Sequence, residues 1–363
     1  MTPRNRRFIL QIIPFGVLWP VFGLVYALIE KGILGDSTHY PSTGNPYDFS
    51  DGLFSVLVLS TFTGMAVGIF EVRYLNRLFI RQSFGVKIAF KALVYLIIIV
   101  AFLLLSATIS NVQKFDTAVS EPVVWNSTWN FLSSFAFWSI AIFIAAVMVM
   151  ALFYSDISDN LGQGVLFNYL TGKYHRPVEE ERIFMFLDMK SSTAFAERLG
   201  HVRYFEMLKA YYADLSDPII DCAGEIYQYV GDEIVVSWPM DEGLRNNNCI
   251  RCFFAMREAL ASKAGQYQQT YGLVPTFKAG LHCGIVTTGE IGIIKKDIIF
   301  TGDVLNTTAR IQGLCNDQGV DFLVSEQLAK KLAPDPSLKI RALGPIALRG
   351  RDEKVALLTM NRP

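Results

Sequence analysis

Four long apolar runs occupy most of the first half of the chain, at about residues 8–29, 53–70, 88–109 and 131–154. Each is long enough to cross a hydrocarbon core of about 30 Å as an α-helix. Glu71 and Lys91 lie near predicted helix ends, where an interfacial position is expected. Gly64 and Gly68 form a GxxxG pattern that allows two helices to approach closely. The pattern predicts a four-helix transmembrane domain over residues 1–154, serving as an anchor or a sensor.

The pattern changes after Tyr154. Residues 155–181 are mixed polar and apolar and predict a cytoplasmic connector, either a tether or a coupling element with a short amphipathic helix near residues 165–170. Residues 182–363 then alternate short apolar strands with amphipathic helices. The strands are expected at residues 183–187, 225–230, 233–238, 276–282 and 298–301, and the longer helices at 204–223, 244–271 and 304–314. This order predicts an α+β ferredoxin-like domain.

Composition agrees with a membrane protein that carries a folded domain. Of the 363 residues, 52% are hydrophobic and 18% are charged, and the mean hydropathy is +0.32. The formal net charge is zero, so bulk charge gives no argument for a nucleic-acid partner, and none is expected. The five cysteines all lie in the second half, which suits a reduced cytosolic domain.

Loop charges predict the orientation in the membrane. The segment before the first apolar run and the second loop are rich in positive charge, whereas the first and third loops carry one lysine each. Cytoplasmic loops are the ones enriched in Lys and Arg. We therefore expect a multi-pass protein of the plasma or inner membrane, with both termini and the folded domain of residues 182–363 in the cytoplasm. The charges are Arg4, Arg6 and Arg7, then Lys31, then Arg73, Arg77, Arg81 and Lys87, and finally Lys114.

Two carboxylates carry the candidate chemistry of the second half. Asp188 ends the first predicted strand, and Asp232 lies in the turn of the predicted hairpin. These strands are neighbours in a ferredoxin-like sheet, so the two carboxylates are expected to converge. Paired oxygen ligands beside a polar segment at a helix N-terminus suit Mg²⁺ holding a triphosphate. That segment comprises Lys190, Ser191, Ser192 and Thr193.

A second polar group lies on the predicted helix 304–314. Asn306 and Arg310 are four residues apart and share one helix face. An amide and a guanidinium placed together can position a ribose and stabilise charge on a phosphorus atom.

The order and spacing of these features make residues 182–358 resemble the class III nucleotide cyclases. The resemblance rests on Asp188 with Ser192 and Thr193, the Gly231–Asp232 hairpin, the pair His282 and Gly284, and Gly302-Asp303-x-x-Asn306-x-x-x-Arg310. It implies a homodimer that converts ATP or GTP to a 3′,5′-cyclic nucleotide and pyrophosphate at sites shared between subunits.

The same resemblance assigns roles to residues. Asp188, Asp232 and the carbonyl of Met189 would bind two Mg²⁺ or Mn²⁺ ions per active site. Asn306 and Arg310 would be the catalytic residues, contributed by the other subunit, and Arg349 would contact the terminal phosphates. The substrate-binding set is completed by the polar segment after Met189, by Gly231, and by the base-reading positions.

The base-reading positions depart from the family pattern. Gln228 stands where ATP-using members have Lys, and Ile299 stands where its partner is usually Asp or Thr. Asp297 and Thr301 lie nearby as substitutes, and Gln228 can bond to either purine. Family frequency favours ATP over GTP.

Two alternatives stay open at this point. The Val230–Ile234 segment is similar to the hairpin of diguanylate cyclases, although the Asn306/Arg310 pattern fits mononucleotide cyclases. The altered base-reading pair is also consistent with a catalytically silent membrane receptor that binds nucleotide.

Overall fold

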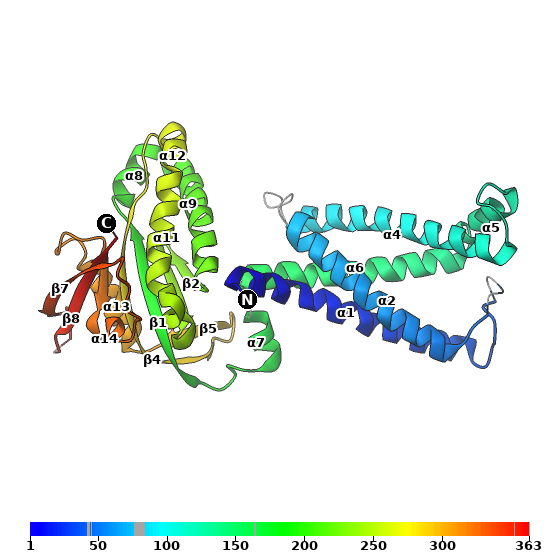
Figure 1. Ribbon diagram of the computed structural model, residues 1–363, viewed down its shortest axis with the longest axis horizontal. Helices are drawn as coiled ribbons and strands as arrows, with labels where there is room; N and C mark the ends of the chain where they lie inside the picture. The colour runs from blue at the N-terminus through cyan, green and yellow to red at the C-terminus, as the bar shows by residue number, and fades with distance from the viewer. Residues whose placement is uncertain (42–43, 45, 76–83, 163–164, 352, 363) are drawn as a thin grey trace. The chain divides into compact units, whose positions relative to one another are not determined.

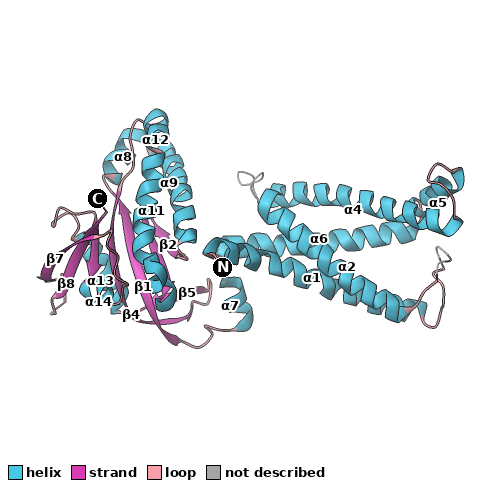
Figure 2. Cartoon of the chain, viewed as in Figure 1, coloured by secondary structure: helices cyan, strands magenta, loops and turns pink. Residues whose placement is uncertain are grey.

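The protein is described by a computed structural model over residues 1–41, 44, 46–75, 84–162, 165–351 and 353–362. The chain divides into two compact units (Figures 1 and 2). One comprises Arg6–Gln163, and the other comprises Met1–Asn5 with Gly164–Pro363. We describe each unit by itself, beginning with the helical unit.

The four predicted apolar helices are present, and they are longer than the apolar runs. By length and composition each is suited to crossing a membrane. The last helix starts later than predicted because Ser134 caps its N-terminus, accepting a hydrogen bond from the Phe137 backbone N–H at 3.3 Å. The helices are α1 (Pro3–Leu34), α2 (Phe49–Phe70) continued by the π-helix η1 (Glu71–Leu75), α4 (Phe84–Phe115), the short α5 (Pro122–Leu132), and α6 (Phe135–Leu161).

The glycine pair of α2 permits close packing within one chain. A Cβ atom at Gly64 would lie 2.5 Å from the carbonyl oxygen of Phe15, and one at Gly68 would lie 3.1 Å from the Phe15 Cβ. Side chains at these positions would therefore push α1 away from α2. The close approach that the GxxxG pattern predicts joins α1 and α2 of the same chain.

The interfacial position expected for Glu71 and Lys91 is wrong. The two side chains form an ion pair and are 1% and 3% exposed, respectively. The Tyr95 hydroxyl donates a hydrogen bond to Glu71 Oε2 at 3.0 Å. Sequence position near a helix end suggested solvent, but Glu71 lies in η1, which turns its side chain toward α4. Of the loop charges used for orientation, Arg77 and Arg81 lie outside the described residues.

The second unit contains the predicted ferredoxin-like sheet, extended by further strands. The short helix α7 (Val165–Thr171) precedes it. The sheet order is β2-β3-β1-β4-β6-β8-β7, with β5 paired to the outer part of β4. The first four positions reproduce the ferredoxin-like order. The strands are β1 (Val178–Met189), β2 (Glu225–Val230), β3 (Glu233–Pro239), β4 (Phe277–Ile291), β5 (Asp297–Thr301), β6 (Phe322–Ser325), β7 (Lys339–Ile346) and β8 (Val355–Asn361).

Helices cover both faces of this sheet. The predicted helix 244–271 is broken into several pieces because Asn246 and Asn247 adopt positive φ angles and Lys263 interrupts it further on. The helices are α8 (Ser192–Leu199), α9 (His201–Asp221), α10 (Met240–Leu244), η2 (Arg245–Asn247), α11 (Asn248–Ser262), α12 (Ala264–Tyr271), α13 (Asp303–Gly313) and α14 (Glu326–Ala329).

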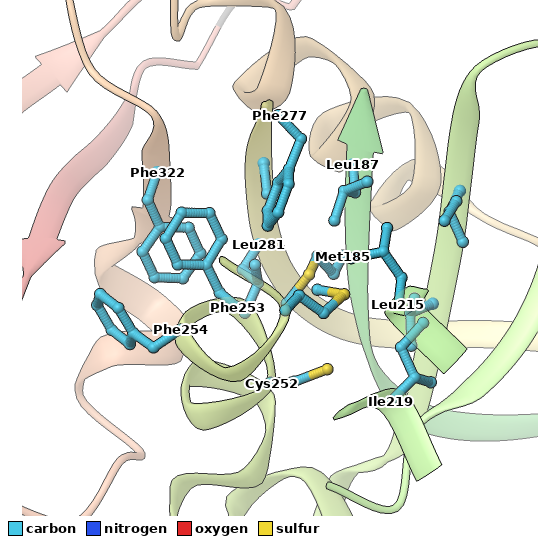
Figure 3. Packing of buried hydrophobic residues seen from close by; sticks show 14 of the residues in the cluster. Met185, Leu187, Leu215, Ile219, Cys252, Phe253, Phe254, Phe277, Leu281 and Phe322 are labelled. Atoms are coloured by element: carbon cyan, nitrogen blue, oxygen red, sulfur yellow. The ribbon is translucent and has the colours of Figure 1, made fainter. Parts of the chain in front are cut away.

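Alternation along β1 divides the core between the two faces. Met185 and Leu187 face α9 and α11 and join the main core, where Phe253 stacks on Phe322 with ring centroids 3.9 Å apart (Figure 3). Phe184 and the other even-numbered positions face the opposite side, in a smaller cluster with β5 and α13. Asp188 therefore emerges on the face that carries α13.

Candidate active site

The two carboxylates predicted to form the site lie side by side at the end of β1. Asp188 is the register partner of Glu233 on β3, and Asp232 immediately precedes Glu233 in the turn. Gly231 has a φ of 62°, a conformation that favours glycine and allows the tight turn. The hydroxyl of Tyr212 donates to the Gly231 carbonyl at 2.5 Å and fixes this turn against α9.

The carboxylates are electrostatically frustrated. Burial raises the pKa of Asp188, and the neighbouring Asp232 raises it further, while Lys278 opposes the shift. The Lys278 Nζ lies 3.4 Å from Asp188 Oδ2. Burial likewise raises the pKa of Glu233, with smaller contributions from Asp188 and Asp232. Lys278 pairs with Asp188, and additional positive charge beside the pair would stabilise the ionised forms of Asp188 and Glu233.

The same pair is suited to hold a divalent cation. Asp232 Oδ2 is buried and has no hydrogen-bond donor among the described residues. Carboxylate and carbonyl oxygens are the ligands that Mg²⁺ and Mn²⁺ prefer. Met189 ends β1 directly after Asp188 and can offer its backbone carbonyl. The described part of the chain has no cluster of three or more His, Cys, Asp or Glu side chains suited to a metal ion, so this site would depend on two carboxylates and backbone or substrate oxygens.

The polar segment after Met189 forms the entry to α8. Ser191 adopts a left-handed backbone with φ of 59°, and Ser192 begins the helix with Thr193 in its first turn. This places backbone N–H groups of α8 next to the carboxylate pair. The Lys190 side chain forms an ion pair with Asp321.

Two glycines on β4 set the position of α13. A Cβ atom at Gly280 would lie 2.4 Å from the Gln312 backbone nitrogen, and one at Gly284 would lie 2.7 Å from Val304 Cγ2. The helix therefore packs directly on the strand backbone. At its C-terminal end Gln312 Nε2 donates to Asp188 Oδ2 at 3.4 Å.

Asn306 and Arg310 occupy a different face of α13 from Gln312. Asn306 is exposed and Arg310 is half-buried, whereas Gln312 is buried toward the sheet. A Cβ atom at Gly350 would lie 3.7 Å from Arg310 Nη2, so the loop that carries the exposed Arg349 passes beside Arg310. The structure thus brings Arg310 close to the Arg349 loop and the two aspartates close to each other.

The predicted base-reading positions lie on strands that touch. Tyr227 of β2 and Phe300 of β5 pack with ring centroids 4.9 Å apart. Gln228 and Ile299 are their respective neighbours in sequence, with Gln228 exposed and Ile299 half-buried. Asp297 accepts a bond from Lys295 at 2.7 Å. Thr301 donates to the Thr287 carbonyl at 3.3 Å.

Sequence reasoning missed several residues that organise the site. Arg351 pairs with Asp303 at 2.9 Å and donates to Thr307 at 2.7 Å, tying the C-terminal segment to the start of α13. Lys278 was also missed. Its position could have been inferred, because Lys278 and Gly280 are two residues apart and therefore lie on the same face of β4. Tyr212 and Gln312 depend on tertiary contacts that no sequence pattern indicates.

His282 lies on the same face of β4 as Lys278 and Gly280, and it is expected to make the stability of the fold depend on pH. Its Nδ1 is 2.8 Å from Ser325 Oγ. Burial, with help from Arg351, lowers its pKa to about 4. An unfolded histidine titrates near 6.5, so the unfolded chain takes up a proton first and stability is lost as pH falls from about 6.5 toward 4. Between pH 7.5 and 5.5 we expect the free energy of unfolding to fall about 1.4 kcal/mol further than in His282→Gln.

Urea unfolding of the full chain in detergent, followed by near-ultraviolet circular dichroism at the two pH values, measures this difference. Equal pH dependence in the two proteins would show that His282 is not the group responsible.

Comparison with known proteins identifies the family of the second unit. Residues 176–360 match the family described as "Adenylate and Guanylate cyclase catalytic domain", and the match covers half of the chain. The chain belongs to this family. This agrees with the class III cyclase resemblance seen in the sequence.

Individual relatives give the same picture. "Adenylate cyclase 2" of Rhizobium meliloti (strain 1021) is 37% identical over 222 residues, which is 61% of this chain and 61% of that protein. "Adenylate cyclase" of Anabaena cylindrica is 26% identical over 180 residues, 48% of this chain and 35% of that protein. The chain therefore spans less than two thirds of either relative. The structure of a bacterial light-regulated adenylyl cyclase shares the fold, with a TM-score of 0.54 at 18% identity over 63% of this chain and 66% of that one.

Proposed function

We propose that this chain is a membrane-anchored cyclase that converts ATP, in preference to GTP, to the 3′,5′-cyclic nucleotide and pyrophosphate. The observation that carries the proposal is the carboxylate pair Asp188 and Asp232, with its unpartnered buried oxygen, in a domain of the cyclase family. The curated relatives described above bear the name adenylate cyclase, which supports ATP as substrate.

Each group of residues in the site has a separate proposed role. Asp188, Asp232 and the Met189 carbonyl would hold two divalent cations, and backbone N–H groups at the start of α8 would bind phosphate oxygens. Such cations, when bound, would help to deprotonate the ribose 3′-hydroxyl and neutralise the leaving pyrophosphate. The 3′-oxygen bonds to the α-phosphorus as the bond to the β-phosphate oxygen breaks. Asn306 would orient the ribose, and Arg310 would stabilise the charge that develops on the α-phosphate.

The remaining phosphate contact is assigned to Arg349. It lies on the loop that passes beside Arg310, and its guanidinium suits the terminal phosphates of a triphosphate.

The placement of α13 supports a site shared by two chains. Gln312, on the buried face, reaches Asp188 of its own chain, while Asn306 projects from an exposed position elsewhere on the helix. An active site that needs the two aspartates together with Asn306 and Arg310 is then completed by Asn306 and Arg310 of a second copy. A two-fold homodimer supplies two such sites.

Substrate choice is tested at the base-reading positions. Gln228 and Ile299 offer fewer matched polar groups than a Lys/Asp pair, and one mismatched buried contact costs about 1–3 kcal/mol. We expect Gln228→Lys combined with Ile299→Asp to raise the ATP/GTP ratio of kcat/KM by about 5- to 150-fold. The control is Lys330→Gln, an exposed change at the end of α14, where Lys330 pairs only with Glu326 of the same helix among the ion pairs described. An active double variant with an unchanged ratio would mean that these positions do not read the base.

The proposed orientation puts the cyclase unit in the cytoplasm. The positive-inside pattern predicts that reporters fused after Arg7 or at the C-terminus show cytoplasmic activity. Reporters inserted near Gly44 or Asp116 are expected on the opposite side of the membrane. Matching signals from both sets would contradict the four crossings.

A further inference from the structure

The strand β2 carries a β-bulge at Tyr227, directly before the base-reading position Gln228. Ile226 pairs with Val236 of β3. Gln228 pairs with the adjacent residue Val235, so Tyr227 is the extra residue of the bulge. Tyr227 packs against the cluster that contains Val235, and paired residues of neighbouring strands point to the same face of a sheet. The bulge therefore places Tyr227 and Gln228 on one face, although neighbours in a regular strand alternate.

On this face Tyr227 meets Phe300 of β5, the neighbour of the second base-reading position, Ile299. The two rings pack with centroids 4.9 Å apart, and the Phe300 backbone N–H donates to the Tyr227 hydroxyl at 3.4 Å. In the described sheet β2 pairs with β3 and β5 pairs with β4, so the two base-reading strands are not adjacent. The contact between Tyr227 and Phe300 thus links two strands that no shared ladder joins in the described sheet.

Phe300 is itself held by the first strand of the sheet, β1. The Phe300 and Phe184 ring centroids are 5.4 Å apart, and the guanidinium carbon of Arg182 lies 4.6 Å from the Phe300 centroid. Arg182 is 3% exposed and donates to Ser237 Oγ at 3.1 Å. It also forms an ion pair with Glu225 at the start of β2. Phe300 therefore gives Tyr227 a fixed surface to pack against.

The rest of β2 has little support on this face. It is an edge strand, and Tyr227 is its one residue that is not exposed. A bulge also interrupts the ladder that would otherwise hold the strand. A displacement of about 1 Å is enough to weaken an oriented contact. The position of Gln228 thus depends on the packing of the Tyr227 ring.

We propose that Tyr227 is a positioning residue for purine recognition, which holds Gln228 at the distance from Ile299 that the base of the nucleotide needs. The inference rests on the proposed function, because it takes Gln228 and Ile299 as the residues that contact the base. Tyr227 acts through these two neighbours. Loss of its ring should weaken the contacts with the base and leave unchanged the groups proposed to hold the triphosphate.

The affinity for a nucleotide, compared with the affinity for its phosphate chain, tests this role. Isothermal titration calorimetry of the purified chain in nanodiscs measures two dissociation constants in the presence of Mn²⁺. One is for α,β-methylene-ATP, which cannot release pyrophosphate, and the other is for inorganic tripolyphosphate. Tyr227→Leu should weaken binding of the ATP analogue about tenfold, the effect of one lost base contact, and leave tripolyphosphate binding unchanged. In turnover the KM for ATP should rise similarly, while kcat stays within about threefold.

Matched variants separate positioning from general damage. Tyr227→Phe keeps the ring and should retain most of the affinity for the ATP analogue, because the lost hydrogen bond of 3.4 Å is long. Phe300→Leu removes the partner ring and should reproduce the effect of Tyr227→Leu, including where the latter fails to fold. The double variant should lose about tenfold rather than about a hundredfold, because both changes remove one contact. The control is Tyr271→Leu, since Tyr271 is a half-buried tyrosine of α12 that packs on the main core, and both affinities should be unchanged.

Two results would overturn the proposal. One is a folded Tyr227→Leu or Phe300→Leu protein that binds the ATP analogue as tightly as the unmodified chain. The other is equal weakening of the ATP analogue and of tripolyphosphate, which would show that the ring supports the whole site and not the base contacts. Absence of a cyclic product from the unmodified chain would contradict the proposed reaction alone, because the two affinities are measured without turnover.

Discussion

Asp232→Asn should lower kcat of the purified full chain by about 100- to 1000-fold, which corresponds to a loss of about 3–4 kcal/mol of transition-state stabilisation. The change keeps the shape of the side chain but removes its negative charge. Asp232 Oδ2 is buried without a donor, so it is free to act as a ligand, and the turn around it is held through the Gly231 backbone. Asp188→Asn should have a similar effect. Production of cyclic nucleotide at saturating ATP and Mg²⁺ measures both.

The matched control is Asp241→Asn, because Asp241 is exposed in α10, which follows the end of β3 that is farther from the turn. It should keep normal turnover. Circular dichroism and the melting temperature should be close to those of the unmodified protein in all three variants. Turnover near normal in folded Asp188→Asn and Asp232→Asn proteins would refute the assigned cation site.

Mixed dimers provide the second large effect. Asp232→Asn and Arg310→Ala homodimers should each be nearly inactive, because every site lacks one essential group. Co-expression should restore activity to about a quarter of the unmodified level. Random pairing makes half of the dimers mixed, and each mixed dimer regains one complete site of two. Distinct affinity tags on the two chains allow the mixed dimer to be isolated before its turnover is measured.

Co-expression of Asp232→Asn with Asp188→Asn is the control. These residues would belong to the same half-site, so their mixture should stay inactive. An inactive mixture of Asp232→Asn with Arg310→Ala, in dimers proven to contain both chains, would instead place each complete site within a single chain.

Much of this architecture could be predicted because it follows local patterns. Apolar runs of membrane length gave the four helices, and short alternating strands around Gly231 gave the hairpin with Asp232 in its turn. The ferredoxin-like order then brought Asp188 next to that turn. These features depend on periodicity and turn chemistry, which a single sequence displays directly.

What could not be predicted depends on contacts between distant segments. Glu71 and Lys91 looked like interfacial residues until the π-helix at the end of α2 brought them together. The ion pairs of Lys278 with Asp188 and of Arg351 with Asp303 could not be predicted, because the partners in each pair are far apart in the sequence. The buried indole N–H of Trp19, which has no acceptor among the described residues, likewise becomes apparent only once the helices are packed.

The central claim is the reaction itself, and the identity of the product tests it most directly. The purified chain is incubated separately with ATP and GTP, each with Mg²⁺ or Mn²⁺, and the products are identified by mass and by comparison with standards. We predict 3′,5′-cyclic AMP and an equal amount of pyrophosphate, with a higher kcat/KM for ATP than for GTP. Formation of a cyclic dinucleotide from GTP, or nucleotide binding without any cyclic product, would contradict the account.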